Sequence, residues 1–143
     1  AIVAGASKED AQHIYDFGLT LGTSFQIKDD LLDAFGDPEK FGKQVGGDIL
    51  ANKKTMLLIK ALELANEEQR ASLAKWIAKN DAPTEKINAI KELFEETGAK
   101  SSTQNAMDSY YHESVECLKA LSIDESHKHP LFAFADWLYN REV

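Results

Sequence analysis

The run Phe25-Gln26-Ile27-Lys28-Asp29-Asp30-Leu31-Leu32-Asp33 is followed by Gly36-Asp37 and then by Gly42-Lys43-Gln44-Val45-Gly46-Gly47-Asp48. On a helix, residues four apart lie one above the other, so Asp29 and Asp33 share a face and Asp30 lies on its flank. Like charges this close oppose helix formation unless water, salt or a counter-cation screens them. The run therefore predicts a helix whose last turns present acids to a cation.

The segment after these acids ends the helix and supplies basic side chains. Gly36-Asp37-Pro38 predicts a helix end just beyond Asp33, where the backbone dipole disfavours acids. A small set of carboxylates suits Mg²⁺, which keeps several waters and completes its coordination with phosphate oxygens. The lysines that follow are Lys40, Lys43, Lys53 and Lys54, the last two one to two helical turns after Asp48. Lysines bind phosphates as mobile point charges, so the pattern indicates metal-assisted diphosphate chemistry.

An acidic triplet alone is more often a solvated helix face than a metal site. The ordered combination favours the metal site, because it resembles the second aspartate-rich region of trans-isoprenyl diphosphate synthases. These are the farnesyl, geranylgeranyl and longer polyprenyl diphosphate synthases. The matching pattern is Phe25-Gln26, Asp29-Asp30-x-x-Asp33, Gly36-Asp37, Gly42-Lys43-x-x-Gly46-x-Asp48 and Asn52-Lys53-Lys54-Thr55. The resemblance implies that residues 1–143 are the C-terminal half of a polyprenyl synthetase domain, an all-α helical bundle of the isoprenoid-synthase type.

The resemblance also implies an activity, head-to-tail prenyl transfer. In that family Mg²⁺ ions bridge two aspartate-rich motifs and grip an allylic diphosphate, whose carbon–oxygen bond ionises. Isopentenyl diphosphate then attacks the carbocation, and loss of a proton finishes the step. By position, the expected Mg²⁺ ligands are Asp29, Asp30 and Asp33, and the expected allylic-diphosphate contacts are Lys43 and Lys53. The metals and lysines would neutralise charge that develops on the departing diphosphate.

Two residues before the acids have competing interpretations. Gln26 lies one turn before Asp29 on the same face. In the family the matching Gln lies near the allylic carbocation or its diphosphate, whereas the alternative is a buried, hydrogen-bonded amide. Phe25 either stabilises the carbocation by cation–π interaction or packs in the core, and core packing is the safer interpretation.

Several family features are absent from this sequence. The first aspartate-rich motif and its diphosphate-binding arginines do not occur, and the only arginines are Arg70 and Arg141. The chain opens on Ala1-Ile2-Val3-Ala4-Gly5-Ala6 and closes on an apolar segment that resembles family C-termini. We therefore expect a fragment with little activity alone. The alternative is a non-catalytic helical subunit that modulates a prenyl diphosphate synthase partner, and a terpene cyclase or squalene-type synthase ranks third. Product chain length cannot be read from these residues.

Composition agrees with an acidic enzyme piece. The 143 residues carry 24 acidic and 16 basic side chains, a net charge of −8. This balance argues against nucleic-acid binding, while bound divalent cations can still attract an anionic substrate. No apolar run is long enough to span a membrane, and Cys117 is the only cysteine,. We expect a cytoplasmic location and a homo-oligomer. Apolar faces around Leu21, Phe25 and Leu58, left without the upstream half, are expected to drive self-association.

The apolar spacing is helical throughout, which predicts an all-α class. One helix is expected from Glu9 to about Asp33, and a second, largely buried helix from Ile49 to Ala65. A capping box, Asn66-Glu67-Glu68-Gln69, is expected to start the third. The fourth would run from Pro83 to Gly98, the fifth to Leu121, and a short last helix would follow His129-Pro130. His127 and His129 are expected in a surface turn before this proline.

Overall fold

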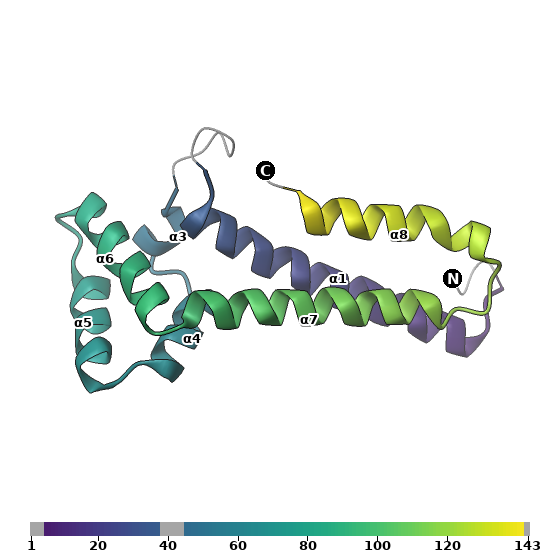
Figure 1. Ribbon diagram of the computed structural model, residues 1–143, viewed down its shortest axis with the longest axis horizontal. Helices are drawn as coiled ribbons and strands as arrows, with labels where there is room; N and C mark the ends of the chain where they lie inside the picture. The colour runs from purple at the N-terminus through teal and green to yellow at the C-terminus, as the bar shows by residue number, and fades with distance from the viewer. Residues whose placement is uncertain (1–4, 38–44, 142–143) are drawn as a thin grey trace. The chain divides into compact units, whose positions relative to one another are not determined.

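The computed structural model describes residues 5–37 and 45–141. These residues form helices and contain no strand, which confirms the all-α class (Figure 1). The helices are α1 (Lys8–Phe35), α3 (Gly47–Leu50), α4 (Met56–Leu64), α5 (Glu67–Ala78), α6 (Pro83–Glu96), α7 (Ala99–Lys119) and α8 (Glu125–Asn140). None of the helices in these ranges is both long and apolar enough to cross a membrane.

The chain divides into two compact units. The first unit joins residues up to Gln26 with Ala106–Arg141, and the second is Ile27–Asn105. The first unit therefore holds most of α1, most of α7 and all of α8. The second unit holds the last turns of α1, the start of α7 and everything between them.

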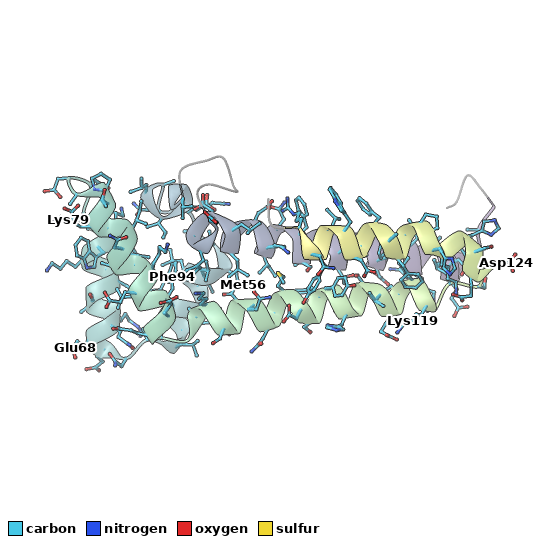
Figure 2. The ribbon with its side chains drawn as sticks, turned by 45° about the horizontal axis from the view of Figure 1, so that its top comes forward. Met56, Glu68, Lys79, Phe94, Lys119 and Asp124 are labelled. Carbon is cyan, nitrogen blue, oxygen red and sulfur yellow. The ribbon has the colours of Figure 1, made fainter. Side chains whose placement is uncertain are left out.

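The first unit has a core built from three helices. Phe17 and Leu21 of α1 pack with Leu118 of α7, with Leu121 just beyond it, and with Ala135 of α8. Their spacing puts the α1 members on one helical face, as an amphipathic helix requires. The carboxylate of Asp10 accepts hydrogen bonds from the Ser122 backbone N–H at 2.8 Å and from its hydroxyl at 2.6 Å. Figure 2 labels Lys119 and Asp124 on either side of this turn.

The second unit is organised around α6, which contacts α3, α4 and α5. Its buried apolar side chains are Ile27, Leu31, Ala34, Ile49, Leu57, Ala61, Ala65, Leu73, Ile90, Leu93, Phe94 and Ala99. Figure 2 labels Phe94, which lies on α6. Burying each large apolar side chain stabilises the fold by about 1.5–3 kcal/mol. This core holds the end of α1 and the segment that follows it in place.

Three predicted helix boundaries are confirmed. Helix α1 ends at Phe35, and the Gly36 N–H donates to the Leu32 carbonyl at 2.8 Å. The expected capping box starts α5: Asn66 Oδ1 accepts from the Gln69 N–H at 2.8 Å, and Gln69 Oε1 accepts from the Asn66 N–H at 3.1 Å. Pro83 stands in the first turn of α6, where its missing N–H is not needed,.

The expected single helix from Ile49 to Ala65 is wrong. Helix α3 ends at Leu50 and α4 begins at Met56, so Lys53 and Lys54 lie in a loop rather than on a helix. Asn52 interrupts the helix with a φ of 51°, which asparagine tolerates better than most residues,. The Thr55 hydroxyl then accepts from the Leu58 N–H at 3.3 Å and caps α4,.

The expected burial of this segment is also wrong in part. Leu57 and Ala61 are buried, but Ile59, Leu62 and Leu64 of α4 are exposed. The apolar faces expected to be left uncovered are not those observed either. Leu21 is buried, and Phe25 and Leu58 are half-buried, because neighbours within their own units cover them.

The last helix begins earlier than expected. Helix α8 starts at Glu125 and contains Pro130, instead of starting after it. The proline removes only one hydrogen-bond donor, and the carbonyl it would have paired belongs to the exposed Ser126,. His127 and His129 are therefore exposed residues of a helix and not of a turn.

Candidate functional site

The predicted acids and the lysine loop come together within the second unit. Asp29, Asp30 and Asp33 lie on the last turns of α1, and Asp48 lies in α3. Lys53 follows in the loop between α3 and α4. The fold of this unit thus brings together the end of α1, helix α3 and the loop that follows α3.

Asp33 ties the end of α1 to the start of α3. Its backbone carbonyl accepts from the Gly46 N–H at 2.6 Å, and its Oδ2 accepts from the Asp48 N–H at 2.9 Å. Burial raises the pKa of the Asp33 carboxyl, while the hydrogen bond from Asp48 opposes this shift,. Gly46 has a φ of 91°, and a Cβ there would lie 2.8 Å from the Ile87 Cδ1. Only glycine meets both conditions without strain.

Lys53 bridges two carboxylates from different elements. Its Nζ lies 3.1 Å from Asp30 Oδ1 and 2.7 Å from Asp48 Oδ2. The hydrogen bonds to Asp48 and to Asp30 raise the pKa of the lysine well above its ordinary value. The Lys53 side chain is 53% exposed, so each ion pair is worth at most about 1 kcal/mol. The carboxylates thus converge on a cation that a stronger ligand can draw away.

Lys86 anchors the loop that carries Lys53 to α6. Lys86 of α6 donates from Nζ to Asn52 Oδ1 at 2.8 Å and to the Ile77 carbonyl at 3.1 Å. A hollow beside the loop combines polar and apolar walls. It is lined by Asp48, Ile49, Asn52, Lys53, Thr55, Leu58, Ile77, Ile90 and Phe94.

The end of α1 also receives cations from other helices. Lys100 of α7 lies 4.2 Å from the centre of the Phe35 ring, and Lys91 of α6 lies 5.4 Å from it. Phe35 is the last residue of α1. Positive charge at a helix C-terminus offsets the negative end of the backbone dipole. Lys100 is also paired with Glu95 Oε1 at 2.6 Å, so only part of this charge acts on the end of α1.

The remaining predicted residues have mixed outcomes. Asp29 is half-buried on α1, and Lys43 lies outside the described residues. Gln26 is exposed, so its interpretation as a buried amide is wrong. Phe25 is half-buried, and the Arg141 guanidinium carbon lies 4.0 Å above its ring, within the first unit. Phe25 thus packs partly in the fold and meets a cationic side chain.

Metal binding needs more than these side chains. Across residues 5–37 and 45–141, no three or more His, Cys, Asp or Glu side chains are grouped so as to hold an ion. Asp30 and Asp48 nevertheless direct carboxylate oxygens at a single ammonium group. Carboxylate oxygens are the ligands that hard metal cations prefer. A bound ion would take its other oxygens from water or from a ligand.

Sequence reasoning missed three members of this site. Asp48 was present in the motif but was not expected to pair with Lys53, which lies five residues later. Asn52 and Lys86 are 34 residues apart, and no local pattern links them. The one available signal was the polar run Asn52-Lys53-Lys54-Thr55 between two apolar segments, since asparagine favours interruptions of a helix.

Comparisons with solved structures define the class of fold. The chain matches a crystal structure of a geranylgeranyl pyrophosphate synthase with a TM-score of 0.87 and 40% identity, over 100% of this chain and 45% of that one. It matches a Caulobacter crescentus polyprenyl synthase, complexed with calcium and isoprenyl diphosphate, with a TM-score of 0.83 and 25% identity, over 100% and 43%. The chain has the helical fold of prenyl synthases. Residues 1–96 match the polyprenyl synthetase family, and the chain belongs to that family.

Curated relatives agree with this assignment. A short chain isoprenyl diphosphate synthase of Methanothermobacter thermautotrophicus is 34% identical over 143 residues, which cover 99% of this chain and 43% of the relative. A geranylgeranyl diphosphate synthase of Sulfolobus acidocaldarius is 33% identical over 122 residues, 85% of this chain and 37% of the relative. The chain thus spans less than half the length of these relatives.

Proposed function

We propose that this chain supplies the half of a prenyl diphosphate synthase that carries the second aspartate-rich motif. The complete enzyme would join isopentenyl diphosphate head-to-tail to an allylic prenyl diphosphate. The observation that carries the proposal is the convergence of Asp30 and Asp48 on the Lys53 ammonium. Carboxylates that gather around a mobile cation can exchange it for metal ions, while the freed lysine binds a diphosphate.

The donor set fits Mg²⁺. It consists of aspartate oxygens, without sulfur or imidazole in the described cluster, and hard cations prefer such ligands,. Asp29, Asp30 and Asp33 would hold the ion. When bound, Mg²⁺ neutralises charge on a departing diphosphate. The calcium and isoprenyl diphosphate named for the Caulobacter crescentus structure belong to the same classes of ligand.

The chain's own residues would divide the work at the diphosphate. Lys53, once released from its carboxylates, would neutralise the diphosphate oxygens, and Lys43 would do the same from the preceding segment. The exposed amide of Gln26 would donate to the diphosphate or lie beside the allylic carbocation. Phe25 would contribute its ring face to the same region.

The partners of this half are also part of the proposal. The first aspartate-rich motif would come from an upstream half, so the chain alone is expected to be nearly inactive. A cytoplasmic location and homo-oligomeric assembly are proposed for the whole enzyme. Family membership supports these assignments.

Calorimetry with geranyl diphosphate, with and without Mg²⁺, tests the proposal. Wild-type chain is expected to bind in a Mg²⁺-dependent manner. Asp30→Asn and Lys53→Gln should each weaken binding roughly tenfold, since hydrogen bonds to charged groups contribute about 1.5–3 kcal/mol. Asp29→Asn is expected to abolish the dependence on Mg²⁺.

Glu63→Gln is the matched control. It removes the same charge from an exposed ion pair with Lys60 on α4, and geranyl diphosphate binding should not change. Equal effects of Asp30→Asn and Glu63→Gln would contradict the proposal. If the folded wild-type chain binds nothing, adding the upstream half of a relative decides whether the motif acts only in the complete enzyme.

A further inference from the structure

Lys86 is a buried cation without an acidic partner. Its residue surface is only 1% exposed. Its Nζ donates to two neutral oxygens, Asn52 Oδ1 at 2.8 Å and the Ile77 carbonyl at 3.1 Å. Among the described residues no carboxylate lies within ion-pair distance of it. Burial of an ammonium is costly, and an apolar side chain of similar volume would often pack at lower cost. Core filling alone therefore does not account for a lysine here.

The contact with Asn52 gives Lys86 a route to the site. Asn52 is the only non-glycine residue of the described chain with a positive φ, at 51°. Its N–H donates to the Ile49 carbonyl at 3.2 Å, and the Lys53 N–H donates to the Asp48 carbonyl at 2.9 Å. The loop is thus a tight turn whose central side chain is anchored to α6. Fixing Asn52 fixes the residue that follows it.

Both acceptors of Lys86 border the site. Asn52 and Ile77 line the same hollow as Asp48 and Lys53. The Lys53 side chain is long and 53% exposed, so holding its ammonium in one place costs rotamer entropy. A loop held at Asn52 reduces the range over which the Lys53 ammonium can move.

We propose that Lys86 is a positioning residue: through Asn52 it fixes the loop that carries Lys53, and so holds the Lys53 ammonium at Asp30 and Asp48, ready for a diphosphate. The diphosphate part of this inference rests on the proposed function. The coupling of Lys86 to Lys53 through Asn52 is a property of the ligand-free chain. The two parts can therefore fail separately.

Binding of inorganic pyrophosphate with Mg²⁺, measured by calorimetry, tests the first part. Lys86→Met removes both hydrogen bonds, and Asn52→Gly removes the acceptor while keeping the positive φ accessible. Each should weaken binding roughly fivefold to tenfold, equivalent to about 1–1.4 kcal/mol. Lys86→Arg, which keeps the charge and the donors, should bind more tightly than Lys86→Met. Lys79→Met is the control, because it removes a lysine at the end of α5 that contacts Trp76 (Figure 2).

A double-mutant cycle separates positioning from general destabilisation. If Lys86 acts through Lys53, Lys53→Gln combined with Lys86→Met should bind pyrophosphate no more weakly than Lys53→Gln alone. Additive losses would overturn the inference. Thermal denaturation reports whether each variant is folded, and Asn52→Gly carries the test if Lys86→Met does not fold.

A spectrum of the ligand-free chain tests the second part. The bonds to Asp30 and Asp48 should slow the exchange of the Lys53 ammonium protons with water, which side-chain ¹⁵N NMR measures. This protection should be lost in Asn52→Gly and kept in Lys79→Met. Unchanged protection in Asn52→Gly would overturn the inference, whatever pyrophosphate does. If wild type shows the protection but does not bind pyrophosphate, the diphosphate part of this inference fails for the isolated chain and the coupling stands.

Discussion

Gly46 is the residue on which the junction between α1 and the following segment most depends. Its N–H donates to the Asp33 carbonyl, its φ is 91°, and its α-carbon faces the Ile87 side chain. The motif positions a glycine here for two separate reasons, one in the backbone and one in packing. A side chain at this point would clash with Ile87 and strain the backbone that bonds to Asp33.

Gly46→Ala should therefore destabilise the chain by about 2 kcal/mol, from left-handed strain and from the clash with Ile87. Urea denaturation measures the change. Gly18→Ala is the control, because Gly18 lies within α1 with nothing within 4 Å of an added Cβ. That variant should gain about 0.5–1 kcal/mol, as alanine stiffens the unfolded chain. Changes of the same sign in the free energy of unfolding of both variants would contradict this account.

At this scale the sequence pointed to candidate residues but not to most of their contacts. Asp30 and Asp33 were expected at the site because their spacing is local to one helix. The pairing of Asp48 with Lys53 required a loop where a helix was expected, and Lys86 reaches Asn52 across 34 positions. Tertiary contacts between segments this far apart leave no periodic signal. Side-chain spacing predicted Asp29, Asp30 and Asp33 as metal ligands, which stays a prediction, and gave no sign of the contact between Lys86 and Asn52.

Helix α8 is fastened to α7 by a pair of tyrosines. The Tyr111 hydroxyl donates to Asp136, and the Tyr139 hydroxyl donates to Asp108 Oδ1 at 3.0 Å. The two rings stack with centroids 4.1 Å apart, and the His112 ring meets Tyr111 edge-on. Each helix thus gives one phenol and one carboxylate to the contact.

These tyrosines make the first unit sensitive to alkaline pH. Burial, and then the hydrogen bond to Asp136, raises the pKa of Tyr111 to about 12. Burial also raises the pKa of Tyr139. An unfolded tyrosine ionises near pH 10, so the folded state keeps its proton longer. The stabilisation is complete below about pH 10 and is lost as pH rises toward about 12.

Denaturation across this alkaline range is the measurement. Tyr111→Phe keeps the ring but removes the ionisable hydroxyl, so its stability should fall less steeply with pH. Its loss at neutral pH should be about 1 kcal/mol, the value of one hydrogen bond. Tyr110→Phe, one residue earlier, should follow the wild-type curve. A Tyr111→Phe curve parallel to wild type would exclude Tyr111 as the titrating group.

The helices themselves were predicted best where a particular residue type marks the boundary. Gly36 and the Asn66–Gln69 box ended and started helices as expected, because these residues satisfy free backbone groups,. The single helix predicted from Ile49 to Ala65 was wrong because the backbone turns at Asn52, where the polar run Asn52-Lys53-Lys54-Thr55 separates two apolar segments. The helix start predicted after Pro130 was wrong because a proline early in a helix removes only one backbone hydrogen-bond donor,.

At the scale of the whole molecule, exposed apolar side chains support the prediction that the chain self-associates. They include Ile59, Leu62 and Leu64 on α4 and Phe134 and Trp137 on α8, besides Tyr15 and Leu19 on α1 and Ile123. Exposed apolar surface favours association. Sedimentation of concentrated chain should show oligomers, and Leu62→Lys with Leu64→Lys should reduce them. A compact monomer at high concentration would refute the prediction.

The hydrogen bonds between Asp10 and Ser122 join positions 112 residues apart. The first unit can therefore close only after its last third has been synthesised, whereas the second unit is continuous from Ile27 to Asn105. Loop closure over a long span is slow, so the second unit should reach its native contacts first. Pulse-labelled hydrogen exchange during refolding should protect the amides of α5 and α6 before those of α8, and the reverse order would refute this. On a ribosome, the acid–lysine loop would be formed before the helix that completes the first unit had left the exit tunnel.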